Sequence, residues 1–238
     1  MKLKAVLFDL DGSLLPMDQN VFLKAYFGGL SKRLAPYGYE PKALIDGVWT
    51  GTTAMVKNDG SKRNEDAFWD TFSGVFGEKV IADKIYFDAF YREDFDLIKA
   101  SCGYDARADK TIKELKKRGY KVALATNPIF PAIATEKRMQ WAGLDKDDFE
   151  LYTTYENARR CKPNPDYYRD ILEMLGVQAE ESLMVGNDVV EDMAAQTLGM
   201  KVFLLTDCLI NKNGVDISVY PHGNLDDLLK AFDEKIFE

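Results

Sequence analysis

Short apolar runs that end in polar clusters recur along this chain and alternate with segments of helical apolar spacing. The apolar runs are residues 5–8, 122–125, 183–185 and 202–205, with a weaker fifth at 151–153. Runs of this length are typical of strands that are buried on both faces. The helical segments are residues 108–118, 131–142, 166–175, 191–198 and 225–232. Strands that alternate with helices predict an α/β fold, in which helices cover both faces of a parallel sheet.

Residues 17–99 have a different pattern, because apolar residues recur there at helical spacing and no convincing buried-strand run occurs. Examples are Phe22, Tyr26 and Leu30, followed by Phe68, Phe72 and Phe76. An aromatic stripe with this spacing is typical of a helix that faces a core. The pattern predicts a helical insertion directly after the first strand, with loops at 48–53 and 57–64. Residues 1–16 and 100–238 would then form the part that contains the sheet.

Two acidic residues follow the first apolar run. Side chains two residues apart point to the same side of a strand, so Asp9 and Asp11 would leave the strand end together. Carboxylates this close repel each other unless a cation or a shared proton lies between them. The pair therefore indicates a metal site, a nucleophile with its acid, or both. An acidic turn without chemical function is the alternative, because Asp-Gly is a common turn pair.

The charge and cysteine content of the 238 residues narrow the choice of partners. Lysine and arginine number 31 against 39 aspartate and glutamate residues, a formal net charge of −8. This balance disfavours nucleic acid and anionic membrane surfaces as partners. No apolar stretch approaches the ~20 residues of a transmembrane helix, and the three cysteines form neither a disulfide framework nor a zinc motif. We therefore expect a protein of the reducing cytoplasm, whose oligomeric state the sequence does not indicate.

Four motifs occur in a fixed order at the ends of the predicted strands. They are Phe-Asp-Leu-Asp-Gly-Ser at 8–13, Thr-Asn at 126–127, Lys-Pro-Asn-Pro-Asp-Tyr-Tyr at 162–168 and Val-Gly-Asn-Asp-Val-Val-Glu-Asp-Met-Ala-Ala at 185–195. With these motifs the chain resembles the haloacid dehalogenase-like superfamily in its phosphatase branch. The resemblance covers residues 1–16 and about 100–210. It implies a Rossmann-like parallel sheet with an α-helical cap inserted after the first strand, which matches the break in pattern at 17–99.

The resemblance assigns roles to residues that follow the first two strands. Asp9 would be the nucleophile that attacks phosphorus and forms an aspartyl-phosphate, and Asp11 would be the general acid and base. Ser13 stands where threonine is commoner and keeps the hydroxyl expected to assist substrate binding. Thr126 and Asn127 would bind the phosphoryl oxygens through a hydroxyl and backbone N–H groups. A simple Asn-Pro turn at Asn127 is compatible with that role.

A Mg²⁺ site is also implied by the resemblance. Asp9, Asp188 and the backbone carbonyl of Asp11 would bind the ion, and Mg²⁺ suits a site with few carboxylates. Asp192 would hold Asp188 or a metal-bound water in place. Asn187 belongs to the same surroundings, without a defined role.

Further substrate contacts would come from one lysine of the core and from the cap. Lys162 would neutralise the transferring phosphoryl group. This assignment depends on the Lys-Pro-x-Pro context, because a lone lysine is usually solvated surface. In this family the cap closes over the site, excludes water and contacts the leaving group. Trp49 and Lys57 are substrate-binding candidates in the cap, together with Thr52 and Arg63.

The leading hypothesis is a Mg²⁺-dependent phosphatase that hydrolyses a small phosphorylated metabolite. A sugar-phosphate mutase is the closest alternative, but mutases of this branch use a cap histidine, and the one histidine here is His222, outside the cap. A dehalogenase would lack Asp11, and a phosphonate hydrolase would need a cap lysine such as Lys57. A non-catalytic binding module on the same fold is a further alternative. It is disfavoured because the nucleophile and the metal ligands are all present.

Overall fold

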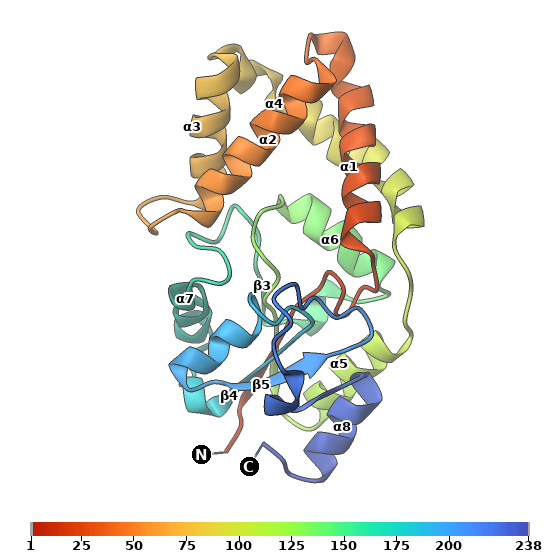
Figure 1. The fold of residues 1–238 in the computed structure, drawn as a ribbon, viewed down its shortest axis with the longest axis vertical. Coiled ribbons are helices and arrows are strands. Elements are labelled where there is room, and N and C mark those ends of the chain that lie inside the picture. The colour runs from red at the N-terminus through yellow and green to blue at the C-terminus, as the bar shows by residue number, and fades with distance from the viewer. Residues whose placement is uncertain (1, 238) are drawn as a thin grey trace.

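The computed structural model describes residues 2–237, with a sheet in its lower part and a bundle of helices above (Figure 1). Within these residues the sheet has six parallel strands in the order β3-β2-β1-β4-β5-β6. The strands are β1 (Ala5–Phe8), β2 (Lys121–Leu124), β3 (Leu151–Tyr152), β4 (Ser182–Gly186), β5 (Lys201–Leu205) and β6 (His222–Gly223). The predicted α/β fold is confirmed, including the weak fifth run. Strand β6 lies outside the predicted runs, because two residues carry no periodicity.

Alternate residues of each strand face two different layers of helices. The elements of these layers are α5 (Arg107–Lys117), α6 (Ala132–Trp141), α7 (Pro165–Leu175), α8 (Leu225–Asp233) and the 3₁₀ helix η6 (Met193–Leu198). Val6 and Phe8 pack in one apolar cluster with α5, α6 and α8, whereas Ala5 and Leu7 pack with α7 and η6. Both faces of β1 are therefore buried, which explains its uninterrupted apolar run. The helix predicted at 191–198 is shorter and has 3₁₀ geometry.

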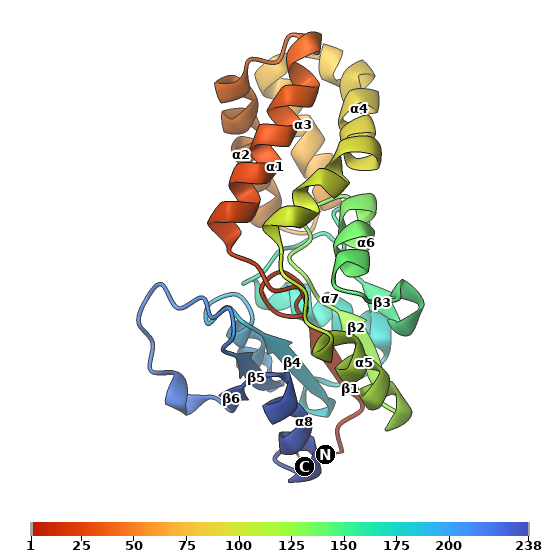
Figure 2. The same cartoon turned by 90° about the vertical axis from the view of Figure 1, so that its right-hand side faces the viewer.

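Helices form the upper part of the molecule (Figures 1 and 2). They are α1 (Gln19–Leu34), α2 (Pro41–Val56), α3 (Asn64–Phe76) and α4 (Lys79–Ala89), followed by the short helices η2 (Phe90–Asp94) and η3 (Phe95–Ser101). Their interior is aromatic: the ring of Phe72 lies 5.5 Å from that of Phe87 and 5.8 Å from that of Trp69, both edge-to-face. None of the helices within residues 2–237 has the length and apolar character needed to cross a membrane.

The loop predicted at 48–53 is wrong, because these residues lie inside α2. The Thr50 hydroxyl donates to the carbonyl of Asp46 at 2.7 Å, one turn earlier, so this polar side chain is satisfied within the helix. Gly51 is required by close packing of α2 against α3. A Cβ at this position would lie 2.6 Å from Cδ2 of Phe68. Glycine and threonine here serve helix packing, although in sequence they are typical of a loop.

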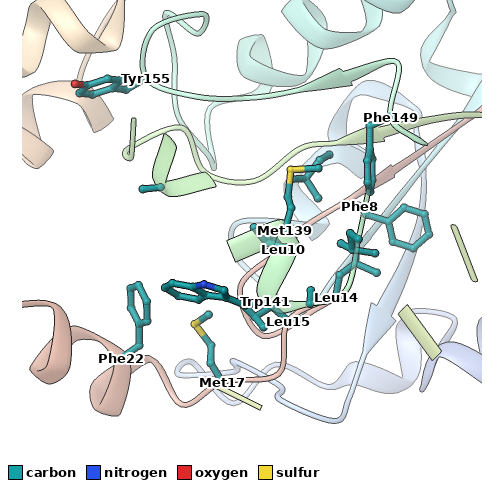
Figure 3. Close-up of a cluster of buried hydrophobic side chains, with 14 of the residues drawn as sticks. Phe8, Leu10, Leu14, Leu15, Met17, Phe22, Met139, Trp141, Phe149 and Tyr155 are labelled. Carbon is teal, nitrogen blue, oxygen red and sulfur yellow. The ribbon is translucent and has the colours of Figure 1, made fainter. Parts of the chain in front are cut away.

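Two of the contacts between the cap and the sheet-containing part lie at the connecting segments and at the start of α3. The first is an apolar cluster around the connecting segments, formed by Leu14, Leu15, Met17, Phe22 and Trp141 (Figure 3). The two connections run side by side there, since the Gly103 N–H donates to the Pro16 carbonyl at 2.7 Å. The second is Asn64, the first residue of α3, which is fully buried and donates to the Pro128 carbonyl at 3.2 Å. Both contacts hold the cap above the carboxyl ends of the strands.

Candidate active site

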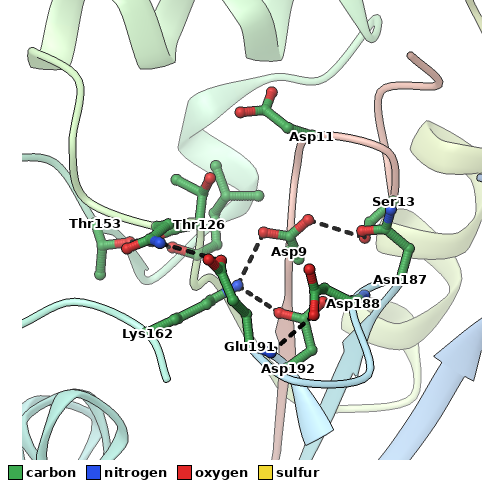
Figure 4. A network of polar contacts seen from close by, with 12 residues as sticks. Asp9, Asp11, Ser13, Thr126, Thr153, Lys162, Asn187, Asp188, Glu191 and Asp192 are labelled. Atoms are coloured by element: carbon green, nitrogen blue, oxygen red, sulfur yellow. Dashed lines mark hydrogen bonds and ion pairs between the residues drawn. The ribbon is translucent and has the colours of Figure 1, made fainter. Parts of the chain in front are cut away.

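The carboxyl ends of the neighbouring strands β1, β2 and β4 lie together at the end of the sheet that faces the cap. These strands are parallel neighbours, so Asp9, Thr126 and Asp188, which follow them, come together (Figure 4). A cavity of about 280 Å³ opens at this end. Its lining includes most of the predicted site residues: Asp9, Asp11, Thr126, Asn127, Asn187, Asp188 and Asp192. The predicted constellation is thus assembled in one place.

Lys162 is a buried ammonium group held between two carboxylates (Figure 4). Its Nζ donates to Asp9 Oδ1 at 2.9 Å and to Asp192 Oδ1 at 2.6 Å, and the side chain has no exposed surface. Burial alone would lower the pKa of Lys162. The attraction of Asp192 and Asp9 outweighs burial, so the pKa of Lys162 lies well above its ordinary value. The lysine is therefore a fixed positive charge beside Asp9.

Asp192 connects Lys162 to the loop that carries Asp188. Its Oδ2 accepts a hydrogen bond from the backbone N–H of Asp188 at 2.9 Å. Burial raises the pKa of Asp192 to about 6, against the opposing attraction of Lys162. Asp188 Oδ1 in turn accepts from the N–H groups of Val190 and Glu191, at 2.7 and 2.9 Å. The contact predicted between Asp192 and Asp188 therefore exists, through the backbone of Asp188.

The turn after β1 orients the second oxygen of Asp9. The Ser13 hydroxyl lies 3.0 Å from both Asp9 Oδ2 and Asn187 Oδ1. Asn187 Nδ2 donates to the carbonyl of Cys208 at 2.6 Å, which fixes the amide. Ser13 is buried behind the cavity and does not line it. Ser13 thus contacts Asp9 directly and helps to position it, and Asn187 contacts Ser13.

Gly12 is required at this turn, and Gly12→Ala is expected to lower the free energy of unfolding by about 1–3 kcal/mol. Its φ is +88°, and an added Cβ would lie 2.3 Å from Nδ2 of Asn187. Activity should fall as well, because Asn187 supports Ser13. Gly119→Ala is the matched control, with φ at +87° and no atom within 4 Å of the added Cβ. Urea unfolding of both variants checks this prediction, and equal losses would contradict it.

Arg138 contacts Asp11 and is absent from the predicted site. It is fully buried on α6, forms an ion pair with Asp11 Oδ2, and stacks over the ring of Phe130 at 4.4 Å. Asp11 Oδ1 has no hydrogen-bond partner among the described residues. Burial raises the pKa of Asp11, and Arg138 opposes part of this rise. The sequence signal for Arg138 is a charged residue on the apolar face of its helix.

Hydrogen bonds from neighbouring side chains hold Thr126 and Asn127 in place. The Thr126 carbonyl accepts from the hydroxyls of Thr153 and Tyr167, at 2.7 and 2.8 Å. Asn127 Nδ2 donates to Glu191 Oε2 at 3.1 Å, and both residues line the cavity. Burial raises the pKa of Glu191 to about 7. Glu191 is a further site residue that the motifs do not assign, although it lies inside the fourth motif.

Comparison with known proteins decides the family. The family model described as haloacid dehalogenase-like hydrolase matches residues 3–199. The chain belongs to this family. The hydrolase is 26% identical over 201 residues to pyrophosphatase PpaX of Bacillus cereus, with 84% of this chain and 82% of the relative covered. The resemblance in the sequence motifs is thereby confirmed.

Solved structures share the fold of this hydrolase. A HAD phosphatase from Thermococcus onnurineus has a TM-score of 0.61 at 22% identity, covering 97% of this chain and 98% of that chain. A predicted phosphoglycolate phosphatase from Haemophilus somnus has a TM-score of 0.60 at 20% identity, covering 98% and 99%. At these identities the likeness concerns the fold alone. It confirms the Rossmann-like α/β architecture.

The oxygen donors of the hydrolase fit Mg²⁺. No group of three or more His, Cys, Asp or Glu side chains suited to a metal occurs within residues 2–237. Two carboxylates, Asp9 and Asp188, line the cavity, and Mg²⁺ commonly takes one or two carboxylates together with waters and phosphate oxygens. Asp11 Oδ2 is paired with Arg138, which leaves Oδ1 and the backbone carbonyl of Asp11 as its other oxygen donors. This set of hard oxygen donors suits Mg²⁺ better than zinc.

The candidate cap residues of the hydrolase divide into two groups. Trp49 and Thr52 of α2 line the cavity. Lys57 follows the C-terminal end of α2 and is exposed, and Arg63 is exposed at the start of α3. Neither Lys57 nor Arg63 lines the cavity. Trp49 and Thr52 are therefore placed to contact a molecule bound in the cavity, whereas Lys57 and Arg63 are not.

Proposed function

We propose that this protein is a Mg²⁺-dependent phosphatase that hydrolyses small phosphate monoesters through an aspartyl-phosphate on Asp9. The observation that carries the proposal is the position of Asp9. Lys162 and Ser13 bind its two oxygens, and Asp188 lines the same cavity. A carboxylate whose two oxygens are held in place beside a fixed cation is oriented as a nucleophile must be.

The residues of the chain would divide the reaction into two steps. In the first, an oxygen of Asp9 bonds to phosphorus, the ester bond breaks, and Asp11 gives its proton to the leaving oxygen. In the second, water attacks phosphorus, Asp11 takes the water proton, and phosphate leaves Asp9. Burial raises the pKa of Asp11 against the opposing charge of Arg138, and this direction suits a general acid. Mg²⁺, held by Asp9, Asp188 and the Asp11 carbonyl, would supply positive charge for the phosphate anion.

The charge of the chain explains why the proposal needs two cations, Mg²⁺ and the ammonium group of Lys162. The chain has a net charge of −8, and the cavity is lined by several carboxylates, so an anionic substrate meets a repulsive field. Lys162 is the fixed cation in contact with Asp9, and donors such as the backbone and side chain of Asn127 would complete the phosphate site. Hydrolysis of a phosphate group also agrees with the names of the relatives, a pyrophosphatase and two phosphatases.

A sugar-phosphate mutase remains the alternative within the family. A mutase of this branch would require a cap histidine, and the chain contains a single histidine. His222 lies in β6, is exposed, and contacts the Tyr220 carbonyl through Nδ1 at 2.8 Å. Its place at the edge of the sheet gives no support to that alternative. Hydrolysis therefore has better support than transfer back to substrate.

The metal requirement provides the test. The purified protein is expected to hydrolyse p-nitrophenyl phosphate with Mg²⁺, to lose this activity with a chelator, and to regain it on addition of Mg²⁺. Asp188→Asn should raise the Mg²⁺ concentration needed for half-maximal activity by about 10-fold or more. Asp109→Asn, on the outer side of α5, is the matched control and should behave like the wild type. Activity that is indifferent to chelation would contradict the proposal.

A further inference from the structure

A second cavity, of about 70 Å³, adjoins the active-site cavity and extends into the cap. Both cavities are lined by the same five side chains: Leu23, Trp49, Thr52, Ile129 and Phe130. The ring of Trp49 lies 5.5 Å from that of Phe27, which lines the upper cavity. The upper cavity therefore lies among aromatic side chains of the cap and shares part of its lining with the cavity that contains Asp9.

The size of the upper cavity limits what it can hold. An apolar cavity of about 150 Å³ binds benzene, and the upper cavity, at about 70 Å³, has roughly half that volume. A ring attached to a phosphate on Asp9 would therefore contact the shared side chains, which include Trp49 and Phe130, and would not lie wholly inside the upper cavity. Both side chains are aromatic, and ring contacts of this kind add to the gain from apolar burial.

The lining of the two cavities offers no cation to a second anionic group. Within residues 2–237, no lysine, arginine or histidine is among the lining residues. Lys162 lies behind Asp9, and Arg138 is bound to Asp11 behind Phe130. The charged residue of the upper cavity is Asp88. A carboxylate or a second phosphate on the leaving group would thus lie among apolar and acidic side chains, at a cost in free energy.

Polar side chains for a sugar are few on the cap side: besides tyrosines and tryptophans, Gln19, Thr52 and Asp88 line the cavities. The hydroxyls of Tyr26 and Tyr91, which line the upper cavity, are 2.8 Å apart and bond to each other. Trp69 Nε1 donates to the Tyr155 hydroxyl at 3.5 Å. A leaving group with several hydroxyls would lose hydrogen bonds to water without replacing most of them.

We infer that the substrates are phosphate monoesters with an uncharged, apolar leaving group of about the size of one aromatic ring. The inference depends on the proposed phosphatase function and names the substrate class for the same site. The phosphoryl group would bind at Asp9, and the leaving group would contact Trp49, Phe130 and Ile129. Substrates with a second anionic group, such as phosphoglycolate and pyrophosphate, would be poor.

The first test compares substrates whose leaving groups are all alcohols. With Mg²⁺, kcat/KM for 2-phenylethyl phosphate is expected to exceed that for phosphoglycolate and glycerol 3-phosphate by about 10- to 100-fold. Calorimetric binding to the Asp9→Asn variant should give the same order, and this measurement does not depend on turnover. A higher efficiency and tighter binding for phosphoglycolate would overturn the inference while leaving the phosphatase function intact. Absence of turnover for every ester would instead refute the proposed function, and the binding order would still test the substrate class.

Variants of α2 provide the second test. Trp49→Ala is expected to lower the ratio of kcat/KM for 2-phenylethyl phosphate to that for methyl phosphate by about 10-fold. Ile85→Ala removes an exposed apolar side chain of the cap outside both cavities and should leave the ratio unchanged. An unchanged ratio in Trp49→Ala would overturn the inference.

A change of charge gives the sharpest comparison. Thr52→Arg places a cation among the side chains that line both cavities. It should raise the ratio of kcat/KM for phosphoglycolate to that for 2-phenylethyl phosphate by about 10-fold or more. Thr53→Arg is the matched control, since Thr53 is exposed, lies next to it on α2 and lines neither cavity. Equal effects of the two substitutions would mean that Thr52 does not face the bound leaving group, and would overturn the inference.

Discussion

Replacement of Asp9 by asparagine is expected to lower kcat by roughly 10⁴- to 10⁶-fold, the range found when a catalytic nucleophile is removed. The amide keeps the shape of the side chain but cannot form the acyl phosphate. Lys162 keeps its second partner, Asp192, at 2.6 Å, so the fold should survive. Steady-state turnover of p-nitrophenyl phosphate, with circular dichroism as a check on folding, measures the effect.

A covalent intermediate gives a second readout for the same residue. Rapid quenching of the wild type during turnover should yield one phosphoryl group on the peptide that contains Asp9, and Asp9→Asn should yield none. Asp109→Asn serves as the control for loss of a carboxylate without a role in the cavity. Full activity in Asp9→Asn, or a phosphoryl group on another residue, would refute the mechanism.

Replacement of Lys162 by methionine is expected to reduce both activity and stability. Two buried carboxylates, Asp9 and Asp192, would lose their common cation, and removal of one member of a buried ion pair costs about 3–5 kcal/mol of unfolding free energy. Loss of a positive charge from the phosphate site should lower kcat by about 10²-fold or more. Urea unfolding and steady-state kinetics measure the two effects separately.

The stability loss in Lys162→Met should depend on pH. Burial already raises the pKa of Asp192 to about 6 in the wild type, and removal of the lysine raises it further. A carboxyl group whose pKa is raised by folding favours the folded state below its unfolded pKa, and this contribution is lost as pH rises through the folded pKa. The variant should therefore be closest to the wild type near pH 4–5 and increasingly destabilised as pH rises above about 6.

Lys113→Met is the matched control for this substitution. Lys113 is exposed and pairs with Asp109 one turn away on α5, at 2.8 Å, so its loss should cost no more than about 0.5 kcal/mol at any of these pH values. A Lys162→Met protein as stable as the wild type at about pH 8 would contradict the account of a buried pair. A loss of stability that is the same at about pH 4.5 and about pH 8 would contradict the role of Asp192.

Strand ends and motif residues could be predicted because they depend on local sequence. Ala5–Phe8 is buried on both faces, so its apolar run is uninterrupted, and Asp9 follows where the strand ends. The order of the motifs then indicated which chemistry these ends could support. The loop predicted at 48–53 was wrong because the composition there depends on a contact between two helices. Gly51 is there because of Phe68 on another helix, and sequence periodicity does not report such a neighbour.

Arg138 and Glu191 illustrate contacts that sequence reasoning did not find. Arg138 lies 127 residues from Asp11, and nothing in its own helix indicates that partner. Glu191 stands inside a recognised motif, but its bond to Asn127 depends on β2 and β4 lying on either side of β1. Both residues change the electrostatics of the cavity, and both depend on how distant segments pack.

The sequence by itself determined the α/β class, the helical insertion and the identity of the acidic, hydroxyl and lysine side chains that gather at the strand ends. Tertiary structure alone decided that Lys162 lies between Asp9 and Asp192 and that Asp11 pairs with Arg138. It also decided that an aromatic cavity adjoins the active-site cavity and that, within residues 2–237, no lysine, arginine or histidine lines either one. The physical reason is the range of the interactions. Strand and helix patterns arise between residues close in sequence, whereas the shape and charge of a cavity arise where segments up to 174 residues apart come into contact.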